Sequence, residues 1–227
     1  SGYMKEGFSQ IFMISSTGGK PIQVTTEKYN HYSFDWMSGS DGFVFSSNYT
    51  EDWEYDFRNS EIYSISVNGS NLQQLTDRNG PDMGAAVSPD GKSIAYLGYE
   101  DKVQTYQINN LTIMNIDGSN KRTIDIELDR NIESLKWSAD GKNLYFMYDN
   151  YGNTKIATTN LTGRVRKLID DVGGTSIGRP YGGGSFSVSS EGEISYTLTS
   201  PYHPADIGYY EGNSFKRLTN LNNDLFS

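Results

Sequence analysis

The sequence predicts an all-β fold made of repeated four-stranded sheets, the blades of a β-propeller. A Gly-containing turn recurs about every fifty residues, strand-like runs flank each turn, and a second Gly-containing hairpin follows each of them. Aromatic and β-branched residues that alternate with polar ones indicate strands. Four strands in each repeat of this length are typical of propeller blades.

The first turn of each repeat is a short polar segment that contains glycine. Proline at the second position and glycine at the fourth suit a type I turn followed by a left-handed residue, which closes a tight hairpin. The four copies are Ser40-Asp41-Gly42, Ser88-Pro89-Asp90-Gly91, Ser138-Ala139-Asp140-Gly141 and Ser190-Glu191-Gly192.

Each of these turns joins two strand-like runs, which would be the first and second strands of a blade. Their aromatic and β-branched content favours strands over helices. The runs before the turns are 34–36, 85–87, 135–137 and 186–188, and those after them are 43–45, 94–96, 144–146 and 194–196.

A second hairpin would supply the third and fourth strands. In the first repeat it joins 61–65 to 73–76 through Asn68-Gly69, and the unit ends on Leu75-Thr76. Related patterns occupy 111–118, 155–163 and 207–212, and a further copy lies at 10–14 and 23–25. Asparagine and glycine supply the left-handed conformations that such turns need.

These repeats predict a β-propeller domain, or its C-terminal part, over residues 1–227. It would hold about four and a half blades: a half blade at 8–27 and blades at 28–77, 78–127, 128–171 and 172–221. No helical period competes with the strand pattern. A β-sandwich with coincidental spacing is the alternative, although sandwiches rarely repeat a turn at fixed intervals.

The two tight turns of each blade would lie on one face and the longer connections on the other. The expected long connections within blades are 46–60, 98–108, 148–154 and 199–205, and those between blades are 78–84, 128–133 and 172–185. Because function concentrates in long loops carried by a rigid scaffold, we expect binding contacts on this second face.

The most conspicuous loop, residues 48–58, interleaves acidic and aromatic side chains. It is either a pocket wall that binds an amine by charge and an apolar chain by stacking, or a solvated loop with anchoring aromatics. General loop behaviour favours the second interpretation. The substrate or interface candidates in the loop are Asp52, Trp53, Glu54, Tyr55, Asp56 and Arg58.

The composition of the chain limits the kinds of partner that it could bind. The formal net charge is −9 and no Lys/Arg cluster is visible, which argues against nucleic acid as a partner. No apolar run is long enough to span a bilayer. The absence of cysteine excludes disulfides and thiolate metal sites, but it leaves both a periplasmic and a cytoplasmic location open.

No catalytic residue, metal site or cofactor site is predicted. Residues 174–178 match the nucleophile-elbow pattern, but proline and three glycines follow where that motif requires a helix. The two histidines, His31 and His203, are interpreted as loop or capping residues, with no second histidine near either of them. No phosphate-binding glycine loop precedes a helix.

The repeat, with its Trp-Ser-Pro-Asp-Gly-Lys pattern, Gly hairpin and Leu-Thr ending, resembles TolB-like propellers. It also resembles the propellers of the prolyl oligopeptidase family of serine peptidases. Segments 177–188, 200–207 and 217–225 are similar to the final blade of the acylaminoacyl-peptidase and dipeptidyl-peptidase branch. Arg179, Tyr181 and His203 lie in these segments and join the substrate or interface candidates.

The resemblance implies a non-catalytic propeller that caps the active site of an α/β-hydrolase domain in the same polypeptide. The substrates would be oligopeptides, and the catalytic triad would lie outside this chain. Family propellers have seven or eight blades, so the resemblance also implies further N-terminal blades.

Two other functions stay open. The first is a stand-alone TolB-like protein-interaction propeller. The second is a propeller enzyme such as a polysaccharide lyase, which would need a histidine–metal cluster.

Overall fold

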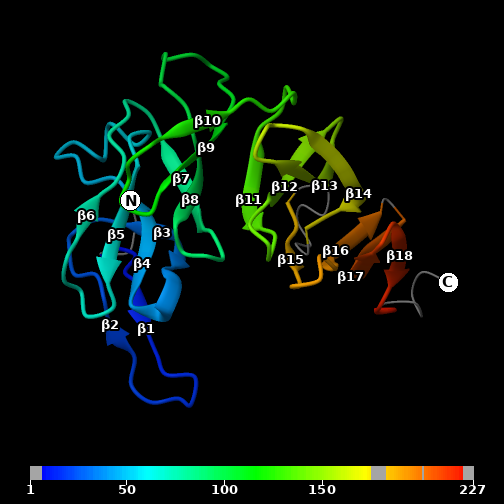
Figure 1. The fold of residues 1–227 in the computed structure, drawn as a ribbon, viewed down its shortest axis with the longest axis horizontal. Helices are drawn as coiled ribbons and strands as arrows, with labels where there is room; N and C mark the ends of the chain where they lie inside the picture. The colour runs from blue at the N-terminus through cyan, green and yellow to red at the C-terminus, as the bar shows by residue number, and fades with distance from the viewer. Residues whose placement is uncertain (1–6, 175–182, 201, 222–227) are drawn as a thin grey trace, which may run out of the picture. The chain divides into compact units, whose positions relative to one another are not determined.

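The computed structural model describes residues 7–174, 183–200 and 202–221. The chain forms two compact units, Ser1–Thr123 and Ile124–Ser227. Within the described residues the secondary structure is antiparallel β, apart from one 3-10 turn at Ser38–Ser40. The predicted all-β class is therefore confirmed (Figure 1).

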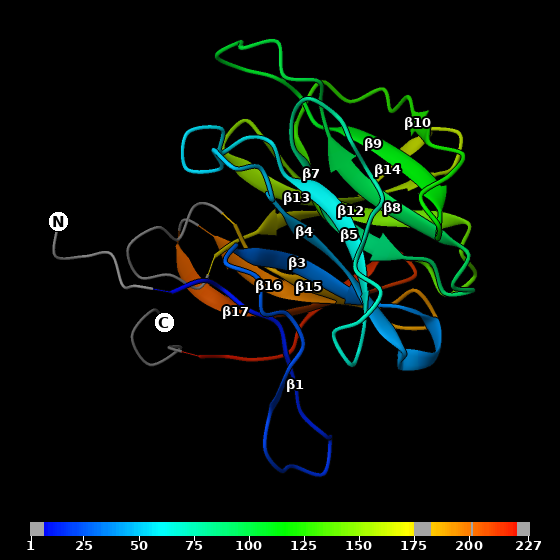
Figure 2. The same ribbon diagram turned by 90° about the vertical axis from the view of Figure 1, so that its left-hand side faces the viewer.

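The first unit contains a two-stranded sheet and two four-stranded sheets, each a simple meander. The two-stranded sheet pairs β1 with β2, and its hairpin projects from the unit in both ribbon views (Figures 1 and 2). The strands are β1 (Phe12–Met13), β2 (Ile22–Gln23), β3 (His31–Trp36), β4 (Gly42–Ser47), β5 (Glu61–Ser66), β6 (Gln73–Gln74), β7 (Asp82–Val87), β8 (Ser93–Gly98), β9 (Asn110–Asn115) and β10 (Arg122–Ile124), the last ending at the unit boundary.

The second unit contains one eight-stranded sheet that consists of two successive meanders. The strands β14 and β16 join the meanders through the single residue pair Val172 and Leu198, while β15 pairs with β16 beside this junction. The strands are β11 (Ile132–Trp137), β12 (Asn143–Asn150), β13 (Asn153–Asn160), β14 (Val165–Val172), β15 (Phe186–Val188), β16 (Ile194–Ser200), β17 (His203–Glu211) and β18 (Ser214–Arg217).

A backbone irregularity marks the repeat inside the first strand of three sheets. The register shifts within the pairs β3–β4, β7–β8 and β11–β12. At each shift one residue has a left-handed backbone, namely Ser33, Gly84 and Ser134, with φ of 52°, 65° and 59°. A bulge of this kind bends a strand and increases its twist.

The predicted glycine turns form in three repeats but are displaced in the first. Gly91, Gly141 and Gly192 have positive φ, and each N–H donates to the carbonyl of the serine three residues earlier. In the first repeat the left-handed residues are Gly39 and Ser40, and Gly42 begins β4 instead. Gly42 is needed for close approach, since a Cβ there would lie 2.6 Å from the Ile65 carbonyl oxygen.

Two of the predicted long connections are tight hairpins. The strands β12 and β13 pair from Asn143 and Asn160 down to Asn150 and Asn153, so the expected loop 148–154 does not exist. Tyr151 and Gly152 close the hairpin with φ of 52° and 80°, the positive values that a type I′ turn requires. The prediction for 199–205 is also wrong, because Ser200 pairs with His203 at the end of β16 and β17. The loops 48–60 and 99–109 are long, as predicted.

Apolar side chains fill the space between the sheets of the first unit. The cluster between the sheets β3–β6 and β7–β10 consists of Val44, Ile62, Leu75, Ala85, Ile94, Tyr96 and Met114. A second cluster lies between β1–β2 and β4–β5 and consists of Ile11, Val24, Phe43, Phe45, Tyr63 and Ile65. The sheets of the first unit are thus held face to face by buried apolar area, the dominant stabilising term in such folds.

Candidate functional site

The acidic and aromatic loop of residues 48–60 folds on itself at the end of the β4–β5 hairpin. The buried Asn48 side chain donates to the Asp56 carbonyl oxygen at 2.6 Å, and the Tyr55 and Asp56 amides donate to the Asp52 carbonyl oxygen. Trp53 contacts Phe8 edge to face at 6.0 Å. The loop is therefore held by its backbone and by two anchoring side chains.

Most of the remaining candidate side chains of this loop point to solvent. Asp52, Glu54 and Arg58 are exposed, Tyr55 is 85% exposed, and Asp56 is half-buried. The Arg58 guanidinium lies 5.3 Å from the centre of the Phe57 ring. Whether these residues bind a ligand stays a prediction, while Arg179 and Tyr181 lie outside the described residues.

A polar pocket of about 400 Å³ lies at the base of the loop. The loop contributes its two ends to the pocket wall, and none of its six candidate residues belongs to the lining. The lining residues are Tyr49, Thr50, Asn59, Glu61, Tyr63, Gln74, Asp77, Arg78 and Asn79.

Glu61 is a pocket residue whose carboxyl group is much harder to ionise than a carboxyl group in water. It begins β5 and is only 7% exposed. Thr76 Oγ1 accepts from the Ile62 N–H at 2.8 Å and donates to Glu61 Oε2. Burial raises the pKa of Glu61 to about 8, with a further contribution from Asp82, against the opposing effect of the Thr76 hydrogen bond.

Glu61 is not among the residues predicted from the sequence, although a recurring pattern in the repeats marks its position. In three repeats a polar residue stands directly before an isoleucine that lies in or next to the third strand: Gln10, Glu61 and Asp206. In two of them its side chain bonds to the threonine that follows the fourth strand, in the pairs Glu61–Thr76 and Asp206–Thr219. A buried polar side chain at this position is therefore part of the strand-pairing geometry.

His31 is a buried structural residue at the start of β3. Nδ1 lies 2.9 Å from the Ser9 carbonyl oxygen, which can only accept, so Nδ1 carries the proton. Nε2 lies 2.7 Å from the Tyr49 hydroxyl. The ring also packs on Phe45 at 5.2 Å. His31 thus links the segment before β1 to the loop after β4.

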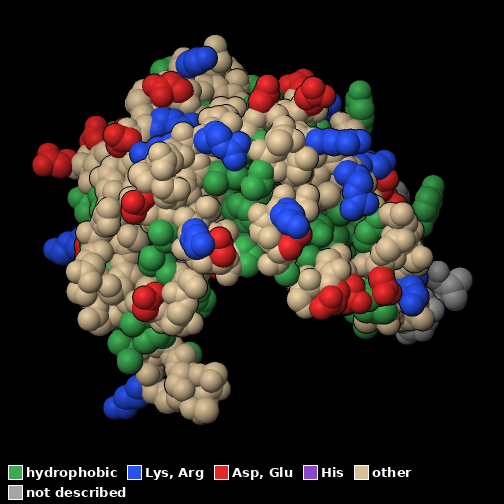
Figure 3. Space-filling view, viewed as in Figure 1, with side chains coloured by type: hydrophobic (Ala, Val, Ile, Leu, Met, Phe, Trp, Pro, Cys, Tyr) green, Lys and Arg blue, Asp and Glu red, His purple; other side chains and the backbone are tan. Residues whose placement is uncertain are grey.

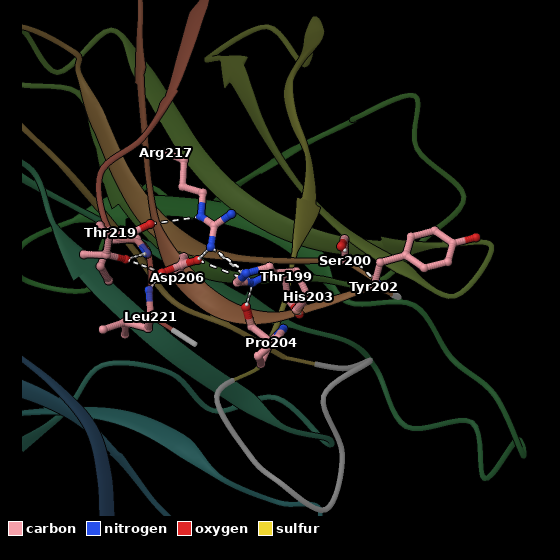
Figure 4. Close-up of polar contacts among 10 residues, drawn as sticks. Thr199, Ser200, Tyr202, His203, Pro204, Asp206, Arg217, Thr219 and Leu221 are labelled. Carbon is pink, nitrogen blue, oxygen red and sulfur yellow. Dashed lines mark hydrogen bonds and ion pairs between the residues drawn. The ribbon is translucent and has the colours of Figure 1, made fainter. Parts of the chain in front are cut away.

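A second polar cluster surrounds the buried carboxylate of Asp206 (Figure 4). Asp206 Oδ1 accepts from Thr219 Oγ1 at 2.5 Å and from the Leu221 N–H at 3.0 Å, and Arg217 forms an ion pair with Oδ2. Burial opposes ionisation of Asp206, but these hydrogen bonds and the Arg217 charge outweigh it and lower its pKa. The cluster fastens β18 and the following segment to β17.

His203 belongs to this cluster, and its imidazole contacts Arg217 and the backbone. Arg217 always carries protons, so its Nη2 donates to His203 Nε2 at 2.6 Å, and Nδ1 lies 2.9 Å from the Pro204 carbonyl oxygen. Both ring nitrogens are therefore engaged. The nearby Ser200 Oγ accepts from the Tyr202 N–H at 3.3 Å.

Among residues 7–174, 183–200 and 202–221, no group of three or more His, Asp or Glu side chains is placed to hold a metal ion. No helix in that part of the chain is long and apolar enough to cross a membrane. On the face in Figure 3, Lys and Arg side chains lie interspersed with acidic and hydrophobic ones.

The protein has the fold of a TolB-like β-propeller, because its sheets superpose on those of solved TolB structures. The putative TolB of Agrobacterium tumefaciens superposes with a TM-score of 0.70 and 17% identity, covering 93% of this chain and 74% of that one. A puromycin-hydrolysing peptidase of Mycobacterium tuberculosis superposes with a TM-score of 0.67 and 14% identity, and the match covers 94% of this chain and 35% of that one. An oligogalacturonate lyase in complex with manganese superposes with a TM-score of 0.69 and 13% identity, and the match covers 96% of this chain and 61% of that one.

The sequence is similar to dipeptidyl-peptidase 5 proteins, and this confirms the resemblance to propellers of prolyl oligopeptidase family peptidases. The Porphyromonas gingivalis protein is 22% identical over 154 residues, which is 66% of this chain and 22% of that protein. A probable dipeptidyl-peptidase 5 of Arthroderma benhamiae is 30% identical over 155 residues, covering 61% and 21%. The chain thus spans about a fifth of these relatives. No family model matches it.

Proposed function

We propose that this chain is the non-catalytic propeller portion of a serine peptidase that acts on short peptides. In this proposal it covers the active site of an α/β-hydrolase domain of the same polypeptide and limits the size of the substrates that enter. The similarity to dipeptidyl-peptidase 5 proteins carries the proposal. The relatives are much longer than this chain, which leaves room in them for a catalytic domain.

The arrangement of polar groups supports a non-catalytic role for the described residues. Both ring nitrogens of His31 and of His203 are engaged in structural hydrogen bonds. A general base needs a ring nitrogen within reach of its nucleophile. The reaction itself would therefore be carried out by residues of the hydrolase domain.

Activity assays on two polypeptides test the proposal. The chain alone should not cleave a chromogenic dipeptide, whereas the longer polypeptide that contains it should, and a fluorophosphonate should abolish that activity. Cleavage by the chain alone, or a parent polypeptide without a hydrolase domain, would contradict the proposal. The second outcome would favour the stand-alone interaction propeller.

The size limit has its own test in the longer polypeptide. We expect kcat/KM to be high for di- to decapeptides and to fall sharply for an unfolded polypeptide of about a hundred residues. Propellers that cover an active site act by excluding bulky chains, so the fall should be in access and not in chemistry. Equal kcat/KM for both substrates would contradict the size limit.

The acidic loop is the proposed contact with the peptide substrate. If Asp52, Glu54 and Asp56 attract the substrate amine, replacing all three by the matching amides should raise KM several-fold and leave kcat unchanged. Asp117→Asn is the matched control, because Asp117 is an exposed acid in the turn between β9 and β10. An unchanged KM in the triple variant would assign the loop a purely structural role.

A further inference from the structure

Two buried carboxyl side chains lie at the contact between the sheets β3–β6 and β7–β10. Glu61 begins β5 and Asp82 begins β7, and they are 7% and 1% exposed. The sheets meet there through the Asp82 N–H, which donates to the Ser60 carbonyl oxygen at 2.7 Å. Ser60 Oγ donates back to the Asp82 carbonyl oxygen at 3.1 Å. Both carboxyl groups are therefore adjacent to the backbone contact that joins the sheets.

The charges around Asp82 are only partly balanced. Arg78 lies 3.2 Å from Asp82 Oδ1, and this buried oxygen has no hydrogen bond among the described residues. The Arg78 guanidinium also lies 6.0 Å from the centre of the Tyr96 ring. Farther out, Lys121 pairs with the exposed Asp77 at 3.5 Å.

Among the described residues, the Glu61 carboxyl group has one hydrogen-bond partner and forms no ion pair. Thr76 donates to its Oε2 atom, and Tyr63 from the same strand lines the same pocket. The only guanidinium in that lining, Arg78, is already paired with Asp82. Burying two carboxylates beside one guanidinium is costly, since each loses its hydration.

We infer that the contact between these two sheets is proton-linked, closed while Glu61 is protonated and loosened when Glu61 becomes an anion. Protonated Glu61 accepts the Thr76 hydrogen bond without bringing a second negative charge near Asp82. On ionisation the proton passes to solvent through the polar pocket. The carboxylate then draws water into the pocket and repels Asp82.

The acid–base properties of the two groups give the direction of the effect. Burial is the main cause that raises the pKa of Glu61 to about 8 and that of Asp82 to about 6. In an opened state both return towards about 4. Opening should therefore become easier as the pH rises. The increase should approach about a hundredfold per pH unit between pH 5 and 6, where both groups lose a proton on opening, and about tenfold per unit between pH 6 and 8, where only Glu61 does, and it should level off above pH 8.

Hydrogen exchange of the Asp82 amide measures this opening directly, because that N–H forms the bond to Ser60. After correction for intrinsic exchange, its protection in the full chain should fall steeply from pH 5 to 8. Glu61→Gln should keep protection constant above pH 6, where only Glu61 titrates. Glu100→Gln, at an exposed acid of the same unit, should behave like the wild type.

Two results would overturn the inference. One is a wild-type protection that does not change between pH 6 and 8, and the other is the same fall in Glu61→Gln. If that variant does not fold, carbon-13 NMR of the wild-type Glu61 carboxyl decides, because a pKa below about 5 removes the proton that the inference requires.

Discussion

Thr76 Oγ1 accepts a hydrogen bond from the backbone N–H of Ile62 at 2.8 Å, at the point where the fourth strand of the sheet β3–β6 ends. The preceding residue, Leu75, donates its N–H to the Ile62 carbonyl oxygen at 2.8 Å. The threonine hydroxyl thus takes the place of a backbone carbonyl as the acceptor for the Ile62 N–H. This explains why the repeat ends on an apolar residue followed by threonine.

The same geometry recurs in two other sheets of the chain. The threonine hydroxyl accepts from the isoleucine amide at 2.9 Å in both pairs, Thr25–Ile11 and Thr219–Ile207. The preceding apolar residue again donates to the isoleucine carbonyl oxygen at 2.8 Å in Val24–Ile11 and Leu218–Ile207.

We expect Thr76→Val to destabilise the chain by about 1–3 kcal/mol, because it leaves the buried Ile62 N–H without an acceptor. Thr76→Ser keeps the hydroxyl and should cost less. Urea unfolding followed by circular dichroism measures both. Thr17→Val, at an exposed turn, is the control and should change stability by less than about 0.5 kcal/mol. Equal effects of Val and Ser at position 76 would show that packing, not the hydrogen bond, matters there.

Removing the Arg217 guanidinium should make the chain more sensitive to acid. The pKa of Asp206 is below its usual value, so its contribution to stability is complete above about pH 4 and is lost as the pH falls through the folded-state pKa. Arg217→Met removes the positive charge that stabilises the Asp206 carboxylate, so it should raise the midpoint of acid unfolding by about 0.5–1 pH unit. Lys216→Met, on the same strand, should leave it unchanged. A midpoint equal to that of the wild type would show that Arg217 does not stabilise the carboxylate.

Asp35 links two sheets of the first unit, because its Oδ2 atom accepts from the Val87 N–H at 2.9 Å. Asp35→Ala should cost about 1–3 kcal/mol by leaving that donor unpaired. Asp35→Asn retains an acceptor oxygen and should cost less than half as much. Thermal unfolding of the three proteins ranks them, and an alanine variant as stable as the asparagine variant would contradict this assignment.

The Tyr196 ring lies over Gly208 on the paired strand β17, and a Cβ at Gly208 would come within 2.5 Å of it. Gly208→Ala should therefore destabilise the second unit by about 1–3 kcal/mol through overpacking. A double-mutant cycle with Tyr196→Leu checks the cause, since the alanine should cost much less once the ring is absent. Additive effects would rule out the ring contact as the source.

The sequence predicted the repeat well because strand periodicity and turn residues are local signals. It placed the first turn at Gly42 instead of Gly39 and Ser40, because a glycine required by a neighbouring strand looks the same as a turn glycine. The Tyr151-Gly152 hairpin was missed since tyrosine rarely adopts a positive φ.

The candidate site was harder to predict than the fold. An acidic loop is visible in the sequence, but the pocket at its base depends on where β5, β6 and the segment 77–79 meet in space. Glu61 looks like an ordinary strand residue, and its burial follows from packing against the next sheet. The role of His203 likewise depends on Arg217, which is fourteen residues away.

The Val172–Leu198 pair makes the two meanders of the second unit one continuous hydrogen-bonded sheet. Separating them requires breaking this strand pairing as well as the apolar contact between Val172 and Leu198, so neither meander has a clean boundary at which to unfold alone. The second unit should consequently lose its structure in one cooperative step, without a half-unfolded intermediate that exposes an open strand edge to aggregation.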